Sequence, residues 1–193
     1  GAGRTDAAHD PQHLVVCPYE KDDQERLVAA FTEEKNDRPR LRYGWGCVLI
    51  LETGLRVGEA LALEWGDIDE EKRTLKVTKN MVWVDGKNTV QRTTKTEPGR
   101  CTIPLNSRTL EAIQHLKAQQ VEGCPYVFAT QTGKHLSYRN LLATMETACE
   151  AAGVEHRGLH SLRHSFGGCC PSRRGSKSSP ADRQPSGGVR YSS

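Results

Sequence analysis

Long hydrophobic runs are missing from this chain of 193 residues, of which 36% are hydrophobic. A helix that spans a bilayer needs about 20 consecutive apolar residues, and no stretch of the sequence approaches that length. An apolar region of the kind that marks a secretory signal is missing as well. We therefore expect no membrane segment and a cytoplasmic protein.

Cysteine pairs of the C-x-x-C type are also missing, although the chain has seven cysteines. Their number is odd and they are scattered, which favours a reducing compartment in which they remain thiols. His160, His164, Cys169 and Cys170 lie close together in the sequence, but their spacing matches none of the usual zinc patterns. We predict neither a metal site nor any other cofactor.

A large net charge is missing too, since the formal value is +3. Any binding to nucleic acid must therefore come from a local cluster of cations. Residues 167–193 hold five Arg or Lys against one Asp, and fifteen of these residues are Gly, Pro or Ser. Such a segment buries too little apolar surface to offset its ordering entropy. We predict a linker at 1–17, one domain at 18–166 and a disordered tail at 167–193.

The pattern of residues 18–166 predicts an α+β fold that is mostly helical, with a small three-stranded antiparallel sheet inserted between helices. Apolar residues recur at helical spacing on both sides of a central stretch with strand character, and Asp85-Gly86 is a strong hairpin signal. The expected strands are 75–84, 89–96 and 101–104. The expected helices follow Pro18, end at Thr53, follow Gly54, begin at an N-cap Ser107, run from an N-cap Ser137 to Gly153, and follow Gly158.

Arg56 lies at the turn between two predicted buried helices. Thr53-Gly54 ends the first helix, because glycine accepts the left-handed conformation after a helix at little cost. A guanidinium is always charged and needs a partner so close to apolar sequence. Glu59, three residues further along the same helix face, is one candidate. An anion from outside the chain is the other.

Two later stretches carry further cationic residues. Lys95 lies in Thr94-Lys95-Thr96, just before the expected turn at 97–99; a lysine near a hairpin tip is by itself most often a solvated surface residue. His160 and Arg163 lie three positions apart in H-S-L-R-H, at the start of the last expected helix. Residues at this spacing share a helix face, so both side chains can converge on one phosphate.

These stretches, in this order, resemble the conserved boxes of the tyrosine recombinases, the integrase family that cuts and rejoins DNA. T-G-L-R-V-G-E around Arg56 is similar to the first box, the Lys95 stretch to the catalytic hairpin, and H-S-L-R-H to the second box. The resemblance extends from about Tyr19 to Phe166. It implies a DNA strand-exchange domain whose partners are double-stranded DNA and, in the full-length protein, other recombinase protomers.

The resemblance also implies a role for each matched residue. Arg56 and Arg163 would hold the scissile phosphate with forked guanidiniums. Lys95 would act as general acid for the leaving 5′ oxygen. His160 would hydrogen-bond the phosphate or take the proton of the nucleophile.

The sequence departs from the family pattern after Phe166. The apolar helix, the Leu-Gly-His segment and the helix that carries the nucleophilic tyrosine are not visible there, and Tyr191 is the only tyrosine beyond Arg163. We therefore expect a chain that is truncated or frame-shifted at this end and does not cleave DNA. Two alternatives stay open: a non-catalytic remnant that binds the DNA backbone, and a structural helical domain in which the four matched residues have only internal partners.

Overall fold

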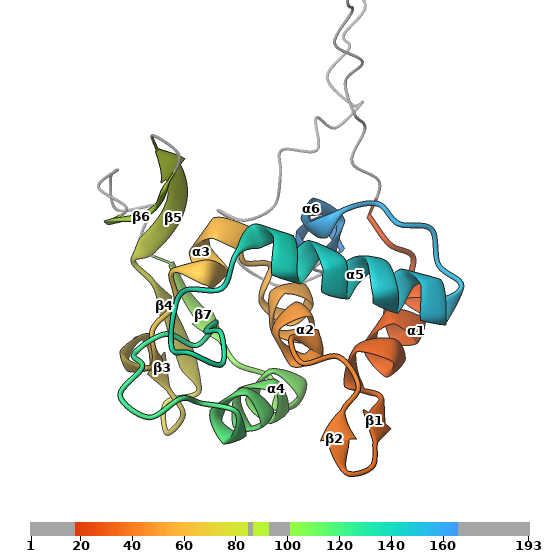
Figure 1. Ribbon diagram of the computed structural model, residues 1–193, viewed down its shortest axis with the longest axis horizontal. Helices are drawn as coiled ribbons and strands as arrows, with labels where there is room; N and C mark the ends of the chain where they lie inside the picture. The colour runs from red at the N-terminus through yellow and green to blue at the C-terminus, as the bar shows by residue number, and fades with distance from the viewer. Residues whose placement is uncertain (1–17, 85–86, 93–100, 166–193) are drawn as a thin grey trace, which may run out of the picture.

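The computed structural model describes residues 18–84, 87–92 and 101–165, in which a group of packed helices lies beside small antiparallel sheets (Figure 1). The mostly helical α+β architecture predicted from the sequence is therefore confirmed. The helices are α1 (Lys21–Thr32), α2 (Gly44–Thr53), α3 (Val57–Leu61), the 3-10 turn η1 (Trp65–Asp67), α4 (Ser107–Ala118), α5 (Tyr138–Ala152) and α6 (Leu159–His164).

Within the described residues the strands form three antiparallel sheets: β1 pairs with β2, β5 pairs with β6, and β4 is the middle strand between β3 and β7. The strands are β1 (Glu34–Lys35), β2 (Arg38–Pro39), β3 (Ile68–Asp69), β4 (Thr74–Val77), β5 (Lys79–Val84), β6 (Lys87–Arg92) and β7 (Cys101–Pro104).

A three-stranded sheet is thus present, but its membership differs from the expected one, because the expected strand 75–84 is divided at Thr78. Thr78 donates a hydrogen bond to Asp67 at 3.5 Å, and the ammonium of Lys79 forms ion pairs with Glu64 and Asp67. These contacts tie the start of β5 to the η1 turn, and β5 then continues into a hairpin of its own with β6.

The central element of the helical group is α2, whose residues 44–51 are all buried. A helix that is apolar on every side must be covered on every side. Helices α1, α4, α5 and α6 all pack against α2 (Figure 1). This packing fixes the position of the C-terminal end of α2, where the first predicted site residue follows.

The helix ends follow the sequence signals closely, with one difference. Ser137 caps α5, and Gly153 ends it with φ 64°, as predicted. The start of α4 is capped one residue earlier than expected, because the side-chain oxygen of Asn106 accepts a hydrogen bond from the main-chain N–H of Thr109 at 2.7 Å. Ser107 is then the first residue of the helix.

Several predictions concern segments outside the described residues: Lys95, Tyr191, the linker at 1–17 and the tail at 167–193. The domain boundaries and the disordered tail therefore stay predictions. Within residues 18–84, 87–92 and 101–165, no helix combines the length and apolar character needed to cross a membrane. The same residues contain no group of three or more His, Cys, Asp or Glu side chains that could hold a metal ion.

Candidate active site

Arg56 is presented by the sharp turn between α2 and α3. Gly54 has the left-handed conformation with φ 63°, and its N–H donates to the carbonyl of Ile50 at 2.9 Å. Leu55 is fully buried and anchors the turn in the core. The next residue, Arg56, is the N-cap of α3, and its side chain is 63% exposed. The turn therefore directs a guanidinium toward solvent from a buried and rigid base.

Glu59 lies in the first turn of α3 and holds Arg56 through both of its carboxylate oxygens. Its Oε2 accepts from the main-chain N–H of Arg56 at 2.8 Å, and its Oε1 accepts from Nη1 of the same residue at 3.0 Å. Glu59 is itself only 9% exposed. The nearby partner considered from the sequence is thus present in the structure.

Arg163 approaches the same turn from α6, which packs against α2. Its Nη1 donates to the carbonyl of Gly54 at 2.9 Å and lies 4.0 Å from Oε2 of Glu59. The side chain is 13% exposed, which is far less than that of Arg56. Arg163 is therefore held from the inside of the fold, whereas Arg56 is open to solvent.

The two arginines are 107 positions apart in the sequence and meet at one carboxylate, that of Glu59. Because the two oxygens of a carboxylate are about 2.2 Å apart, the two Nη1 atoms lie within roughly 9 Å of each other. A phosphate that accepts one hydrogen bond from each guanidinium bridges a comparable span. Two cations facing one anion leave a local surplus of positive charge, which favours an anion at this position.

His160 and Arg163 both belong to α6, at the spacing that places them on one helix face. His160 is exposed, and its imidazole makes no hydrogen bond within the described part of the chain. Three of the four predicted residues therefore belong to two elements, α3 and α6, that meet at Glu59. Lys95 falls in the segment 93–100, between β6 and β7, which lies outside the described residues.

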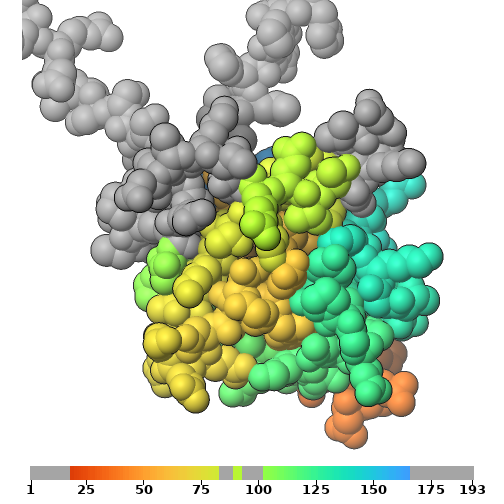
Figure 2. All heavy atoms as spheres, turned by 90° about the vertical axis from the view of Figure 1, so that its left-hand side faces the viewer, coloured from red at the N-terminus to blue at the C-terminus, as the bar shows by residue number. Residues whose placement is uncertain are grey.

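The hairpin β5–β6 lies directly against α3, and Gly58 makes this close approach possible. A Cβ atom on Gly58 would lie 2.3 Å from Oδ1 of Asn80 and 2.6 Å from the carbonyl oxygen of Met81. Figure 2 shows the hairpin at the upper edge of this face, above the α3 region. Because Gly58 has no side chain, α3 and β5 can lie this close together.

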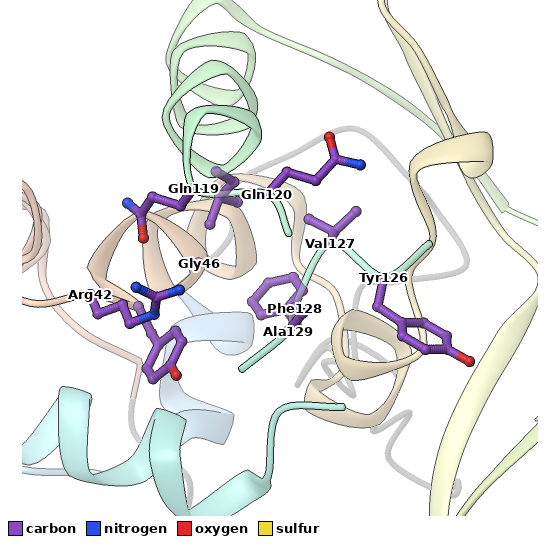
Figure 3. Close-up of a pocket in the computed structure, with 10 residues that line it drawn as sticks. Arg42, Gly46, Gln119, Gln120, Tyr126, Val127, Phe128 and Ala129 are labelled. Carbon is purple, nitrogen blue, oxygen red and sulfur yellow. The ribbon is translucent and has the colours of Figure 1, made fainter. Parts of the chain in front are cut away.

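A separate pocket lies between α2, the end of α4 and the segment 126–129 (Figure 3). Arg42 and Gln119 face each other across it, and the Phe128 ring lies beside them. None of the residues lining this pocket is one of the predicted site residues. The pocket is therefore not the candidate site, which is a solvent-facing surface formed by α3 and α6.

One partner of the site was not found by reasoning from the sequence. The carbonyl of Gly54 accepts from Arg163 across 109 positions, and a main-chain acceptor leaves no signal in residue type. Glu59, by contrast, was weighed as a partner of Arg56 because of its spacing, but its proximity to Arg163 was not foreseen.

Residues 19–168 match the phage integrase family, and this match covers most of the chain. The chain belongs to the phage integrase family. A tyrosine recombinase XerC-like protein of Caldanaerobacter subterraneus subsp. tengcongensis is 32% identical over 140 residues, which is 62% of this chain and 36% of that protein. The ICEBs1 integrase of Bacillus subtilis is 39% identical over 126 residues, which is 58% of this chain and 33% of that protein. The chain thus spans about a third of the length of these integrase-family relatives.

Solved structures of recombinases share the fold of this chain. The Tn1549 transposon integrase, solved in complex with circular intermediate DNA, superposes with a TM-score of 0.66 at 20% identity, over 78% of this chain and 53% of that one. The XerA recombinase superposes with a TM-score of 0.57 at 18% identity, over 82% of this chain and 50% of that one. At these identities the likeness establishes the fold of the integrase catalytic region.

Proposed function

We propose that this chain is part of a site-specific DNA recombinase and that the surface formed by α3 and α6 binds the scissile phosphate of double-stranded DNA. The convergence of Arg56 and Arg163 on Glu59 carries the proposal. Two forked cations held close together suit the two non-bridging oxygens of a phosphodiester. Membership in the integrase family supports the same conclusion.

The chemistry that family membership implies for this site, in a protein that also supplies the nucleophilic tyrosine, is a phosphoryl transfer. A tyrosine oxygen forms a bond to phosphorus, the bond from phosphorus to the 5′ oxygen breaks, and the leaving oxygen takes a proton from the ammonium of Lys95. The phenol proton passes to His160. Arg56 and Arg163 stabilise the negative charge that develops on the non-bridging oxygens, which is the main contribution of positioned cations to such reactions.

The named relatives support DNA as the partner. They are described as tyrosine recombinases and integrases, and the Tn1549 integrase was solved on DNA. Because this chain covers only part of each relative, we extend their activity to the present chain as a proposal rather than as an established property.

DNA binding by matched arginine variants tests the phosphate site. Arg56→Ala should weaken binding about equally for unrelated duplexes and lower the slope of log K against log salt by about 1, the value for one lost phosphate contact. Arg56→Lys should not restore binding, because a lysine lacks the fork. Arg26→Ala is the control, since Arg26 also pairs with an acid three residues away but lies on α1. Equal losses in Arg56→Ala and Arg26→Ala would refute the site.

Cleavage is tested separately, by incubation with a nicked duplex followed by a denaturing gel. A covalent protein–DNA band that disappears in Tyr191→Phe would identify Tyr191 as the nucleophile. We expect arginine-dependent binding without any covalent band, because residues 167–193 show no pattern of the helix that carries the family's tyrosine. The chain would then hold the DNA backbone without cutting it.

A further inference from the structure

The helix that carries His160 and Arg163 is too short to set its own orientation. α6 has six residues, and its N-cap Gly158 provides no side-chain hydrogen bond. Helices of this length are unstable alone, so their position depends on tertiary contacts. The direction in which the two site residues point must therefore be fixed by what holds the rest of α6.

A closed ring of hydrogen bonds holds α6 to Tyr19, which precedes α1. The main-chain N–H of Tyr19 donates to the hydroxyl of Ser165 at 2.7 Å, and that hydroxyl donates to the carbonyl of Ser161 at 2.7 Å. The hydroxyl of Ser161 donates to the carbonyl of Arg157 at 2.7 Å. The N–H of Arg157 donates to the phenol oxygen of Tyr19 at 2.9 Å, which completes the ring. We call these four residues the Tyr19 clasp.

The clasp is partly buried and has further supports. Tyr19 is 2% exposed and Ser161 is fully buried. The guanidinium of Arg157 lies 5.3 Å from the centre of the Tyr19 ring and donates to the carbonyl of Pro18 at 3.0 Å. Gln24 donates to the carbonyl of Tyr19 at 2.8 Å. Tyr19 and Ser161 are shielded from water, whereas Arg157 and Ser165 are half-buried, so water competes only partly for these bonds.

The clasp and the site residues occupy different sides of the same helix. Ser161 and Ser165 are four positions apart and share one face, whereas His160 and Arg163 share another. At 3.6 residues per turn the centres of the two faces are separated by roughly 150°. A rotation of α6 that broke the clasp would therefore swing His160 and Arg163 away from Arg56.

We propose that Tyr19 is a positioning residue for the phosphate site: its main-chain N–H and its phenol grip the back of α6 and so orient His160 and Arg163 at the front. The inference rests on the proposed function only in naming phosphate as the ligand. Tyr19 does not touch the DNA, and it acts through the two serines.

Two variants break the clasp at different points. Ser165→Ala removes the hydroxyl that joins Tyr19 to Ser161. Tyr19→Phe removes the acceptor for the N–H of Arg157 but keeps the aromatic side chain. Ser165→Thr keeps the hydroxyl and should restore the wild-type behaviour. The control is Thr147→Ala, because the hydroxyl of Thr147 likewise donates to a carbonyl four residues earlier, at 2.9 Å, but on the exposed side of α5.

The first readout needs no DNA: the NMR signals of the His160 imidazole and the Arg163 side-chain N–H in the folded protein. We expect both signals to move in Ser165→Ala and Tyr19→Phe and to stay in place in Ser165→Thr and Thr147→Ala. The second readout is affinity for a duplex, which should fall about 3- to 10-fold in the two clasp variants, the effect of losing one hydrogen bond.

The outcomes separate the two proposals. Unchanged His160 and Arg163 signals in a folded Ser165→Ala protein would overturn the clasp even if the wild type binds DNA. Equal shifts in Thr147→Ala would overturn it as well. If the signals move in Ser165→Ala and Tyr19→Phe but the wild-type protein does not bind DNA, the clasp still orients these side chains and the phosphate site is rejected. If Tyr19→Phe does not fold, the pair Ser165→Ala and Ser165→Thr still decides.

Discussion

The two helices that support the candidate site, α2 and α6, pack against each other but are held in the fold by different interactions. α2 is apolar on all sides, and its residues 44–51 are buried among four other helices. α6 buries Leu159 and Leu162, and it is also held by hydrogen bonds through Ser161, Arg163 and Ser165. The first helix supplies the turn that leads to Arg56, and the second supplies Arg163.

The two kinds of contact have different consequences: apolar packing mainly sets the stability of the fold, and hydrogen bonds mainly set the orientation of a helix. Apolar packing depends mainly on the area and volume buried and tolerates small rotations. A buried hydrogen bond depends steeply on direction and loses much of its strength when misaligned. We therefore expect substitutions in α2 to change the free energy of unfolding most. Substitutions behind α6 should change the geometry of the site at a smaller cost in stability.

The largest expected effect tests the apolar side of this comparison. Leu49 is fully buried in α2, and Leu49→Ala should lower the free energy of unfolding by about 2–5 kcal/mol through lost burial and a remaining cavity. Val28→Ala, at a partly buried position on α1, should cost less than about 1.5 kcal/mol. Urea unfolding measures both values. Similar losses in the two proteins would show that α2 is not the centre of the core.

The next effect concerns the contact between α3 and β5. Gly58→Ala places a Cβ within 2.3 Å of Asn80 Oδ1 and 2.6 Å of the Met81 carbonyl, so the strand or the helix must move. We expect a loss of about 1–3 kcal/mol, together with weaker DNA binding because α3 carries Arg56. Gly66→Ala is the control, since its Cβ would meet no atom within 4 Å. A neutral Gly58→Ala in thermal melts and binding would mean that β5 does not fix the position of α3.

A somewhat smaller effect tests the carboxylate between the arginines. Glu59→Gln removes the negative charge near Arg56 and Arg163 and should cost about 1–2 kcal/mol, since the hydrogen bonds to a charged acceptor are weakened. Asp23→Asn removes the partner of Arg26 at the same spacing on α1. That exposed pair should contribute less than about 1 kcal/mol. Both losses of unfolding free energy are measured by chemical denaturation. Equal losses in Glu59→Gln and Asp23→Asn would contradict the shared role of Glu59.

The smallest effect is a loss of stability in alkaline solution. Burial raises the pKa of the Cys47 thiol on α2 well above its usual range. In the unfolded chain the same thiol has a pKa of about 8.5. The folded protein therefore retains a proton that the unfolded chain loses, and stability falls as the pH rises beyond that value. We expect a loss of about 1 kcal/mol by about pH 9 from this residue. Cys47→Ala should flatten this part of the curve of unfolding free energy against pH, and an unchanged slope would contradict the assignment.

The sequence predicted the elements that depend on local patterns and missed those that depend on distant main-chain groups. Gly54 and Gly153 end helices as expected, because a left-handed residue is a local requirement. The division of the expected strand 75–84 was not foreseen, since it depends on ion pairs between Lys79 and acids in the η1 turn. The Tyr19 clasp was equally hidden, because each of its four hydrogen bonds joins a side chain to a main-chain atom that is far away in the sequence or one helical turn away.

For the site itself, motif order was more informative than any single residue. Arg56, His160 and Arg163 were assigned from their resemblance to family boxes, and the structure places them on two elements that meet at Glu59. Their chemical roles remain proposals. The assignment of Lys95 remains a prediction, since its segment lies outside the described residues.

The hydrogen bond from Arg163 to the carbonyl of Gly54 has a consequence for binding entropy. An arginine side chain loses up to about 2 kcal/mol of rotamer freedom when it is fixed. For Arg163 this loss is incurred during folding, because its guanidinium is already held at 2.9 Å from Gly54 and is 13% exposed. Arg56, at 63% exposure, retains more freedom until an anion arrives. Under the proposed function the site is thus half preorganised, because the Arg163 guanidinium is fixed before binding whereas the more exposed Arg56 guanidinium loses its rotamer freedom when the phosphate binds.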